Sequence, residues 1–248
     1  MNKIVKRILI VTGVVIIILA LVMGGFMMKM NSEKKKMNVI ETKEVVHNIY
    51  TIKDSFVNMF LVKDSDKFIA IDAGNDINVI NNELQKLGID PDKVVAIFLT
   101  HTDGDHVAAI SLFKNAKLYL SRDEEQMING KTARALRMHN KISTKSYNLV
   151  DDQQILKIGN LSIQGILTPG HTTGSMSYLV NDSCLFVGDA FGLKKGKVDK
   201  PNAFFTGDMN RAILSFNKIR NLPHATYLFT AHNGFSNDYK NAINTELK

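Results

Sequence analysis

The sequence predicts an α/β protein in which a layered sandwich of strands and helices follows one long apolar helix. Two observations support this fold class. Residues 8–28 contain no charged side chain, which is typical of a membrane-spanning helix. After residue 45, short β-rich runs alternate with helical patterns in two similar halves, the second beginning near residue 155, as expected of sheets covered by helices.

The apolar segment 8–28 is long enough to cross the hydrocarbon core of a bilayer as a helix, and too uniformly apolar for a buried core helix. Cleaved signal peptides have a shorter apolar region and a small-residue cleavage site, whereas residues 23–28 offer glycines without that pattern. We therefore expect an uncleaved, single-pass signal anchor in the lipid of the cell membrane, with a secreted protein as the alternative. A short basic N-terminus predicts that the following domain lies outside the cytoplasm.

The net charge of +7 comes almost entirely from this end of the chain. Residues 1–36 hold seven Lys or Arg and one Glu, so the remainder carries a net charge of only +1. Basic residues beside an apolar span are explained by membrane lipid, and we expect no nucleic-acid partner. The sequence thus predicts an anchor and basic stalk at 1–36 and one domain at 37–248, without indicating an oligomeric state.

The first half of the domain predicts a β-meander followed by alternating strands and helices. The expected strands are 45–52, 56–62, 67–71, 94–99 and 117–120. One helix is capped by Asp76, a second covers 106–113, and a third begins at Ser121. Residues 129–151, including His139, are expected to form a solvated helix and loop on the surface.

The second half predicts more strands and two helices. The expected strands are 155–158, 161–167, 176–180, 184–187 and 226–230. Residues 190–207 should form a loop, residues 208–222 an amphipathic helix, and the residues after 232 a terminal helix. Cys184, the only cysteine, lies in an apolar run and is predicted to be a small buried hydrophobe.

One segment carries a dense set of potential metal ligands. Leu-Thr-His-Thr-Asp-Gly-Asp-His, at 99–106, follows a buried strand. Alternate side chains of an extended segment point the same way, so His101 and Asp103 share one side. Asp105 sits at a predicted helix N-cap and His106 in the first turn, so this pair points elsewhere. Turn and cap roles would explain a single Asp or His, but four together predict half of a two-metal site.

The same pattern recurs at three later strand ends. His171, Asp189 and His232 each stand shortly after a predicted strand. Taken singly, each is explained as a turn, cap or loop residue. Metal sites are built at such positions because rigid strands hold ligands in register, so the joint pattern favours a metal centre.

In this order, the residues are similar to a family signature. His101-Thr-Asp103-Gly-Asp105-His106 and the three later residues resemble H-x-H-x-D-H, His, Asp, His of the metallo-β-lactamase-fold hydrolases, and the resemblance extends over 45–248. It implies a four-layer αββα sandwich with a binuclear centre at one edge of its two sheets. The implied cofactor is two Zn²⁺ ions per chain, with Fe or Mn as alternatives.

The resemblance also implies a role for each residue. The implied ligands are His101, Asp103 and His171 for the first metal, Asp105, His106 and His232 for the second, and Asp189 as a bridge. Asp105 is also the implied catalytic residue, and Asp72 would orient a ligand histidine. A hydroxide between the metals would be the nucleophile, since bound metal lowers the pKa of water.

The chain departs from the signature at Asp103, where the usual residue is His. Aspartate is a zinc ligand, but it adds a negative charge. Two divalent ions, Asp103, Asp105, Asp189 and a hydroxide sum to zero, where the usual site carries +1, so we expect a less acidic bound water. Asp189 stands where zinc-dependent β-lactamases of this superfamily use Cys, and Cys184 is five residues too early to replace it. True β-lactamase activity is therefore not expected.

These features predict a metal-dependent hydrolase acting on a small ester, thioester, lactone or phosphodiester. Sixteen residues follow His232, which argues against a glyoxalase II-type enzyme with its long C-terminal extension. The loop 191–205 should contact substrate, with Lys194, Lys195 and Lys197 available to an anionic group or simply solvated. The alternatives are a membrane-tethered, non-catalytic metal-binding or sensor domain, and an iron-dependent oxidoreductase on the same scaffold.

Overall fold

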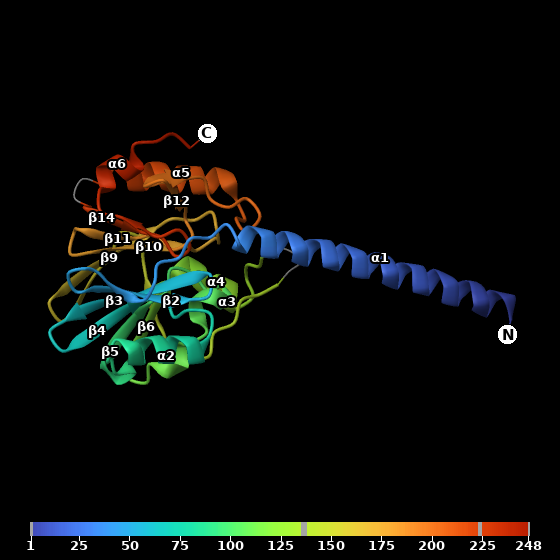
Figure 1. Cartoon of the computed structure of the whole chain (residues 1–248), viewed down its shortest axis with the longest axis horizontal. Helices are drawn as coiled ribbons and strands as arrows, with labels where there is room; N and C mark the ends of the chain where they lie inside the picture. The colour runs from blue at the N-terminus through green and yellow to red at the C-terminus, as the bar shows by residue number, and fades with distance from the viewer. Residues whose placement is uncertain (1, 135–137, 223–224, 248) are drawn as a thin grey trace. The chain divides into compact units, whose positions relative to one another are not determined.

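The computed structural model describes residues 2–134, 138–222 and 225–247 (Figure 1). The chain divides into two compact units, Met1–Met37 and Asn38–Lys248, each of which is described by itself. The first unit is helix α1 (Lys3–Lys34), which is long and apolar enough to cross a membrane and whose apolar side chains are exposed. A membrane anchor and a signal sequence share these properties.

Over its described residues, the second unit contains two large sheets and a small one. The first sheet has the strand order β1 (Lys43–Val46), β2 (Ile49–Asp54), β3 (Val57–Asp64), β4 (Lys67–Ile71), β5 (Val94–Phe98), β6 (Lys117–Ser121) and β7 (Asn148–Val150). The second has the order β15 (Phe235–Ser236), β14 (Tyr227–Phe229), β11 (Cys184–Phe186), β10 (Met176–Val180), β9 (Leu161–Leu167) and β8 (Ile155–Ile158). Strands β12 (Gly192–Lys194) and β13 (Lys197–Asp199) form a hairpin. The first sheet is antiparallel up to β4 and parallel from β4 to β7.

Three apolar clusters divide this unit into four layers. The cluster between the sheets is rich in aromatic rings and includes Phe60, Phe98 and Tyr178. A second cluster packs the first sheet against α2 (Ile77–Lys86), and a third packs the second sheet against α5 (Met209–Arg220) and α6 (Tyr239–Ile243). Figure 1 shows these helices on the outer faces of the two sheets. The predicted αββα sandwich is confirmed.

Three expected elements are wrong in detail. The run 45–52 is divided between β1 and β2, because the turn residue Asn48 has a φ of 65°. The expected loop 190–207 contains the β12–β13 hairpin, which closes through Lys195 and Gly196, both at positive φ. Helix α4 (Arg122–Ile128) ends before residue 129, and the described residues up to 147 form turns and loop instead of the expected helix.

The expected helix 106–113 is also interrupted. Helix α3 (Gly104–Val107) begins two residues early, with Asp103 at the N-cap, and a 3₁₀ turn, η2 (Ile110–Leu112), follows it. The cause is backbone pairing with the turn after β4. The His106 carbonyl accepts from the Ala73 N–H at 2.7 Å, and the Ala109 N–H donates to the Ala73 carbonyl at 2.9 Å. These groups are then not used within a helix.

The second half of the unit reaches the first through a close backbone contact at Gly174. The Ser121 hydroxyl donates to the Gly174 carbonyl at 2.6 Å and accepts from the Glu124 N–H at 2.9 Å. A Cβ at residue 174 would lie 2.0 Å from the backbone nitrogen of Glu124. The loop between β9 and β10 therefore docks on the start of α4 only with glycine at this position.

We expect Gly174→Ala to destabilise the protein by about 1–3 kcal/mol or more, because the methyl group overlaps backbone that has little room to move. Gly104→Ala is the matched control, since its Cβ would meet nothing within 4 Å and its φ is not positive. Urea denaturation of the full chain measures both free energies of unfolding. Equal effects of the two substitutions would contradict the proposed close contact.

Candidate metal centre

All seven predicted site residues lie together in the folded chain. They come from the loops that follow four strands: His101, Asp103, Asp105 and His106 after β5, His171 after β9, Asp189 after β11 and His232 after β14. Within the described residues they form three overlapping groups whose nitrogen and carboxylate oxygen atoms lie within 4.8 Å of one another. The four strand ends thus deliver one cluster, as the sequence predicts.

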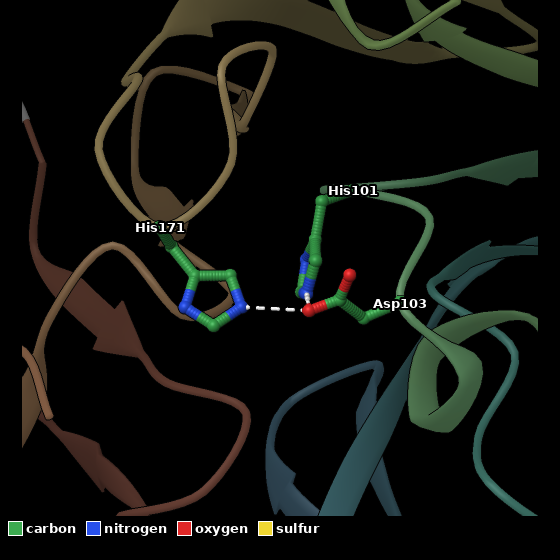
Figure 2. A group of neighbouring side chains, drawn as sticks. All are labelled: His101, Asp103 and His171. Carbon is green, nitrogen blue, oxygen red and sulfur yellow. Dashed lines mark hydrogen bonds and ion pairs between the residues drawn. The ribbon is translucent and has the colours of Figure 1, made fainter. Parts of the chain in front are cut away.

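The first half of the centre consists of His101, Asp103 and His171 (Figure 2). Asp103 Oδ2 lies 3.6 Å from His101 Nε2 and 3.1 Å from His171 Nε2. Figure 2 shows both imidazoles directed toward this carboxylate from separate segments. Two donors that each lie about 2.1 Å from a tetrahedral ion are about 3.4 Å apart, so these spacings are those of a ligand set.

The second half consists of Asp105, His106 and His232. Asp105 Oδ2 lies 3.8 Å from His106 Nε2 and 3.6 Å from His232 Nε2. Asp189 lies between the halves, with Oδ1 at 3.5 Å from His106 Nε2 and Oδ2 at 3.5 Å from His171 Nε2. The Asp189 carboxylate therefore has the position of a bridge.

Hydrogen bonds on the far side of the rings fix how the histidines present their nitrogens. The His106 Nδ1–H donates to Asp72 Oδ2 at 2.8 Å, and the His232 Nδ1–H donates to the Phe56 carbonyl at 2.6 Å. In the neutral form of each ring, Nε2 is then the nitrogen with the lone pair, and it faces the centre.

Thr100 extends this arrangement to His101. Its hydroxyl donates to Asp72 Oδ2 at 2.8 Å and is therefore an acceptor for the His101 Nδ1–H, 3.1 Å away. Asp72 itself is buried, with a φ of 64°. One carboxylate thus orients both histidines of the β5 loop, in agreement with the orienting role expected for Asp72.

The residues present fit a cation. Among the described buried side-chain atoms, His101 Nε2, His106 Nε2 and Asp189 Oδ1 have no hydrogen-bond partner. A buried polar atom without a partner costs free energy, about 1–3 kcal/mol each, and native structures contain few of them. Imidazole nitrogens and carboxylate oxygens are the atom types that bind Zn²⁺ in proteins, so a zinc ion would give all three atoms a partner.

The charges around the centre also favour a cation. Burial lowers the pKa of the His106 imidazole, but the nearby carboxylates, chiefly those of Asp72 and Asp189, outweigh burial and raise it to about 10. Burial raises the pKa of Asp189, but His232 and His106 outweigh it and hold this pKa well below its usual range. The carboxylates around His106 therefore stabilise a positive charge on its imidazole, and they would stabilise a bound metal cation at the same place.

Sequence reasoning missed two residues that contact Asp103. The Arg134 guanidinium donates to Asp103 Oδ2 and lies 3.1 Å from His171 Nε2, while the Asn140 side-chain amide donates to Asp103 Oδ1 at 2.8 Å. Both belong to the segment 129–151, which we expected to lie on the surface. No periodicity or motif marks them. The charge count from the sequence was therefore incomplete, because Arg134 returns the positive charge that Asp103 removes.

Glu124 is a third missed residue, although the sequence contains a signal for it. Ser121 and Glu124 have the spacing of a helix capping box, and the Ser121 hydroxyl does cap α4. The Glu124 carboxylate instead accepts from the Thr102 N–H at 2.8 Å and the Thr172 hydroxyl at 2.6 Å. It joins the β5 loop to the loop after β9, behind the first half of the centre.

The remaining candidates lie away from the seven ligands. Lys194 and Lys195 are exposed, and Lys197 donates to the Asn241 side chain on α6 at 3.0 Å, so Lys197 already has a partner. His139 is exposed, as expected, and its ring contacts the Thr132 carbonyl. Cys184 is half-buried, not fully buried, and burial raises the pKa of its thiol to about 11. Substrate contact by loop 191–205 remains a prediction.

Comparison with known proteins places this geometry in a family. The family model of the metallo-beta-lactamase superfamily matches residues 52–232. The chain is 34% identical over 150 residues to a probable polyketide biosynthesis zinc-dependent hydrolase, PksB, of Bacillus subtilis, covering 58% of this chain and 60% of that protein. It is 31% identical over 182 residues to a hydroxyacylglutathione hydrolase of Bartonella henselae, covering 73% of this chain and 63% of that protein. The matches therefore span about three fifths of the length of these relatives.

Solved structures share the fold at low sequence identity. A B3 metallo-beta-lactamase with an active-site glutamic acid superposes with a TM-score of 0.64 at 19% identity, covering 86% of this chain and 89% of that one. MEM-A1, a subclass B3 enzyme from a soil metagenome library, superposes with a TM-score of 0.62 at 18% identity, covering 79% and 80%. The sequence match, the sandwich and the strand-end ligands agree: the chain belongs to the metallo-beta-lactamase superfamily.

Proposed function

We propose that the chain is a metal-dependent hydrolase of a small ester, thioester, lactone or phosphodiester, tethered by α1 to the cell membrane with its second unit outside the cytoplasm. One observation carries the proposal of a metal. His101 Nε2, His106 Nε2 and Asp189 Oδ1 are buried together without hydrogen-bond partners, at the positions where the superfamily signature has its ligands. Relatives named as hydrolases support the reaction class.

The proposed ion is Zn²⁺, which the name of the Bacillus subtilis relative supports. Fe and Mn remain alternatives, because imidazole and carboxylate donors accept them as well. Asp105, His106, His232 and Asp189 would hold one ion. The expectation of a second ion depends on the first half, where Arg134 contacts two of the three donors.

Asp105, His106, His232 and Asp189 would hold a divalent ion that, when bound, would supply Lewis-acid chemistry toward a water and toward the oxygen of a scissile carbonyl or phosphoryl group. The chain's own residues hold the donors in place. Asp72 and the Phe56 carbonyl prevent His106 and His232 from turning, which keeps both Nε2 atoms on the centre. Asp105 presents Oδ2 to these two imidazoles, and we assign to its carboxylate the acceptance of a proton from the attacking water.

β-Lactams are not proposed as substrates. The similarity to solved β-lactamases, at 18–19% identity, extends to the fold alone and says nothing of the substrate.

The reaction class is tested with the full chain in detergent, supplied with Zn²⁺ and assayed on one thioester, one aryl ester, one lactone and one phosphodiester. We expect turnover of at least one class and a loss of about 100-fold or more in kcat for Asp105→Asn, because the substitution removes both the proton acceptor and one carboxylate donor to the ion. Asp182→Asn is the matched control, since Asp182 lies in an exposed turn away from the site.

The outcomes separate the alternatives. Bound zinc without turnover of any of the four substrates would contradict the hydrolase and favour a non-catalytic metal-binding or sensor domain. Oxygen consumption by an iron-loaded chain would favour the oxidoreductase instead.

Asp72→Asn is expected to weaken zinc binding about 10- to 100-fold, because an amide has only one acceptor oxygen: if that oxygen faces the His106 Nδ1–H, the amide NH2 faces the Thr100 N–H, which is itself a donor. Asparagine tolerates the positive φ at this position, so the backbone keeps its conformation. Competition with a chromophoric chelator measures the affinity. Asp182→Asn, which also replaces an Asp at positive φ, should leave it unchanged. Equal affinities of the two variants would contradict the role assigned to Asp72.

A further inference from the structure

We propose that the Arg134 guanidinium takes the place of a metal ion at the first half of the centre, so that the chain binds a single divalent ion at the second half. The inference rests on the proposed metal-dependent function. It differs from the two-ion site that the family signature implies, and it assigns a role to a residue outside that signature.

His171 Nε2, one of the three potential ligands in the first half, is already engaged by neighbouring side chains. An imidazole nitrogen has one lone pair, and a guanidinium has only N–H donors. His171 Nε2 lies 3.1 Å from Arg134 Nη2 and 3.1 Å from Asp103 Oδ2, so it either accepts from the guanidinium through its lone pair or carries a proton that it donates to the carboxylate. A nitrogen used in this way is not free to ligate a metal. His171 Nε2 is not among the described buried atoms without a partner, whereas His106 Nε2 is. His101 Nε2, which also has none, lies in one group with His106 and Asp189 as well as in the first half.

Asp103 is engaged at both carboxylate oxygens. Oδ2 accepts from Arg134, and Oδ1 accepts from the Asn140 amide at 2.8 Å. Asn140 also contacts the Thr102 hydroxyl at 3.1 Å, so it holds the carboxylate in one orientation. The aspartate that replaces the usual histidine is thus an ion-pair partner that an arginine can use, whereas a neutral imidazole is not.

The guanidinium is fixed by further contacts. Besides Asp103 and His171 Nε2, it donates to the His171 carbonyl and, at 3.1 Å, to the Phe205 carbonyl. Its side chain retains only 19% of its exposure. These contacts come from three segments, and moving Arg134 aside for a metal would remove the donor to the Phe205 carbonyl and one of the donors to the His171 carbonyl and the Asp103 carboxylate.

The side chains of the two halves also differ in net charge, and the difference again favours an ion at the second half only. In the first half, Arg134 neutralises Asp103. In the second, Asp105 and Asp189 carry two negative charges, and the described residues within hydrogen-bond distance of them include no Lys or Arg side chain. One divalent ion at the second half neutralises the cluster, whereas an ion added at the first half would lie against a fixed positive charge.

The proposal is tested by the zinc content of the full chain in detergent, after saturation with Zn²⁺ and removal of free metal by desalting, measured by mass spectrometry of the metal. We expect one zinc per wild-type chain and two per chain in Arg134→Met, because the substitution frees the donors of the first half. Arg122→Met is the matched control and should bind one, since Arg122 pairs with Asp151 on the surface. Two zincs per wild-type chain, or one in a folded Arg134→Met, would overturn the inference.

A second pair of variants tests the location of the ion without altering Arg134. We expect His171→Ala to retain one zinc per chain and His232→Ala to retain none. If two ions are bound, each variant retains a metal at the unaltered half, and the inference fails while the proposed function stands. Wild-type chain that binds no zinc, iron or manganese contradicts the proposed function itself.

Discussion

The centre depends on the buried carboxylate of Asp72. It accepts from the Thr100 N–H at 2.7 Å, from the Thr100 hydroxyl and from the His106 ring, and so connects the end of β4 to the loop after β5. The backbone of the next residue, Ala73, pairs with His106 and Ala109 and shortens the helix that the sequence predicts. The same turn therefore orients two imidazoles and sets the backbone path on which Asp103 and Asp105 lie. The orientation of the imidazoles and the path of this backbone therefore both depend on Asp72, which adopts a left-handed conformation at the end of β4.

The two halves of the centre have different chemistry although both contain His and Asp. Each half has an imidazole held from behind whose Nε2 is buried without a partner, His101 in the first and His106 in the second, and the second half adds the carboxylates of Asp105 and Asp189. In the first half, Arg134 and Asn140 already satisfy Asp103, and Arg134 contacts His171. A signature based on ligand residues alone does not distinguish these situations, because it omits the residues that compete with a metal for the same lone pairs.

The sandwich and the seven converging residues were predictable because both depend on local patterns. Apolar runs define the strands, and a His or Asp just beyond each strand end is carried to one edge by the sheets. Arg134 and Asn140 were not predictable, since their segment has no periodicity and its path is determined by contacts with Asp103 and His171. The prediction of a continuous helix over 106–113 was wrong for a similar reason. The Ala73 backbone forms hydrogen bonds with groups of His106 and Ala109 that a local pattern assigns to the helix.

The most direct test of this account is the position of the metal in crystals of the zinc-loaded chain, located by anomalous scattering at the zinc absorption edge. The account predicts a single strong peak within ligand distance of His106 Nε2, His232 Nε2 and Asp105, about 2.0–2.2 Å. The Arg134 guanidinium should remain against Asp103. A peak of equal strength bound by His101, Asp103 and His171, with Arg134 displaced, would contradict the unequal halves. The absence of any peak among the seven residues would contradict the metal centre.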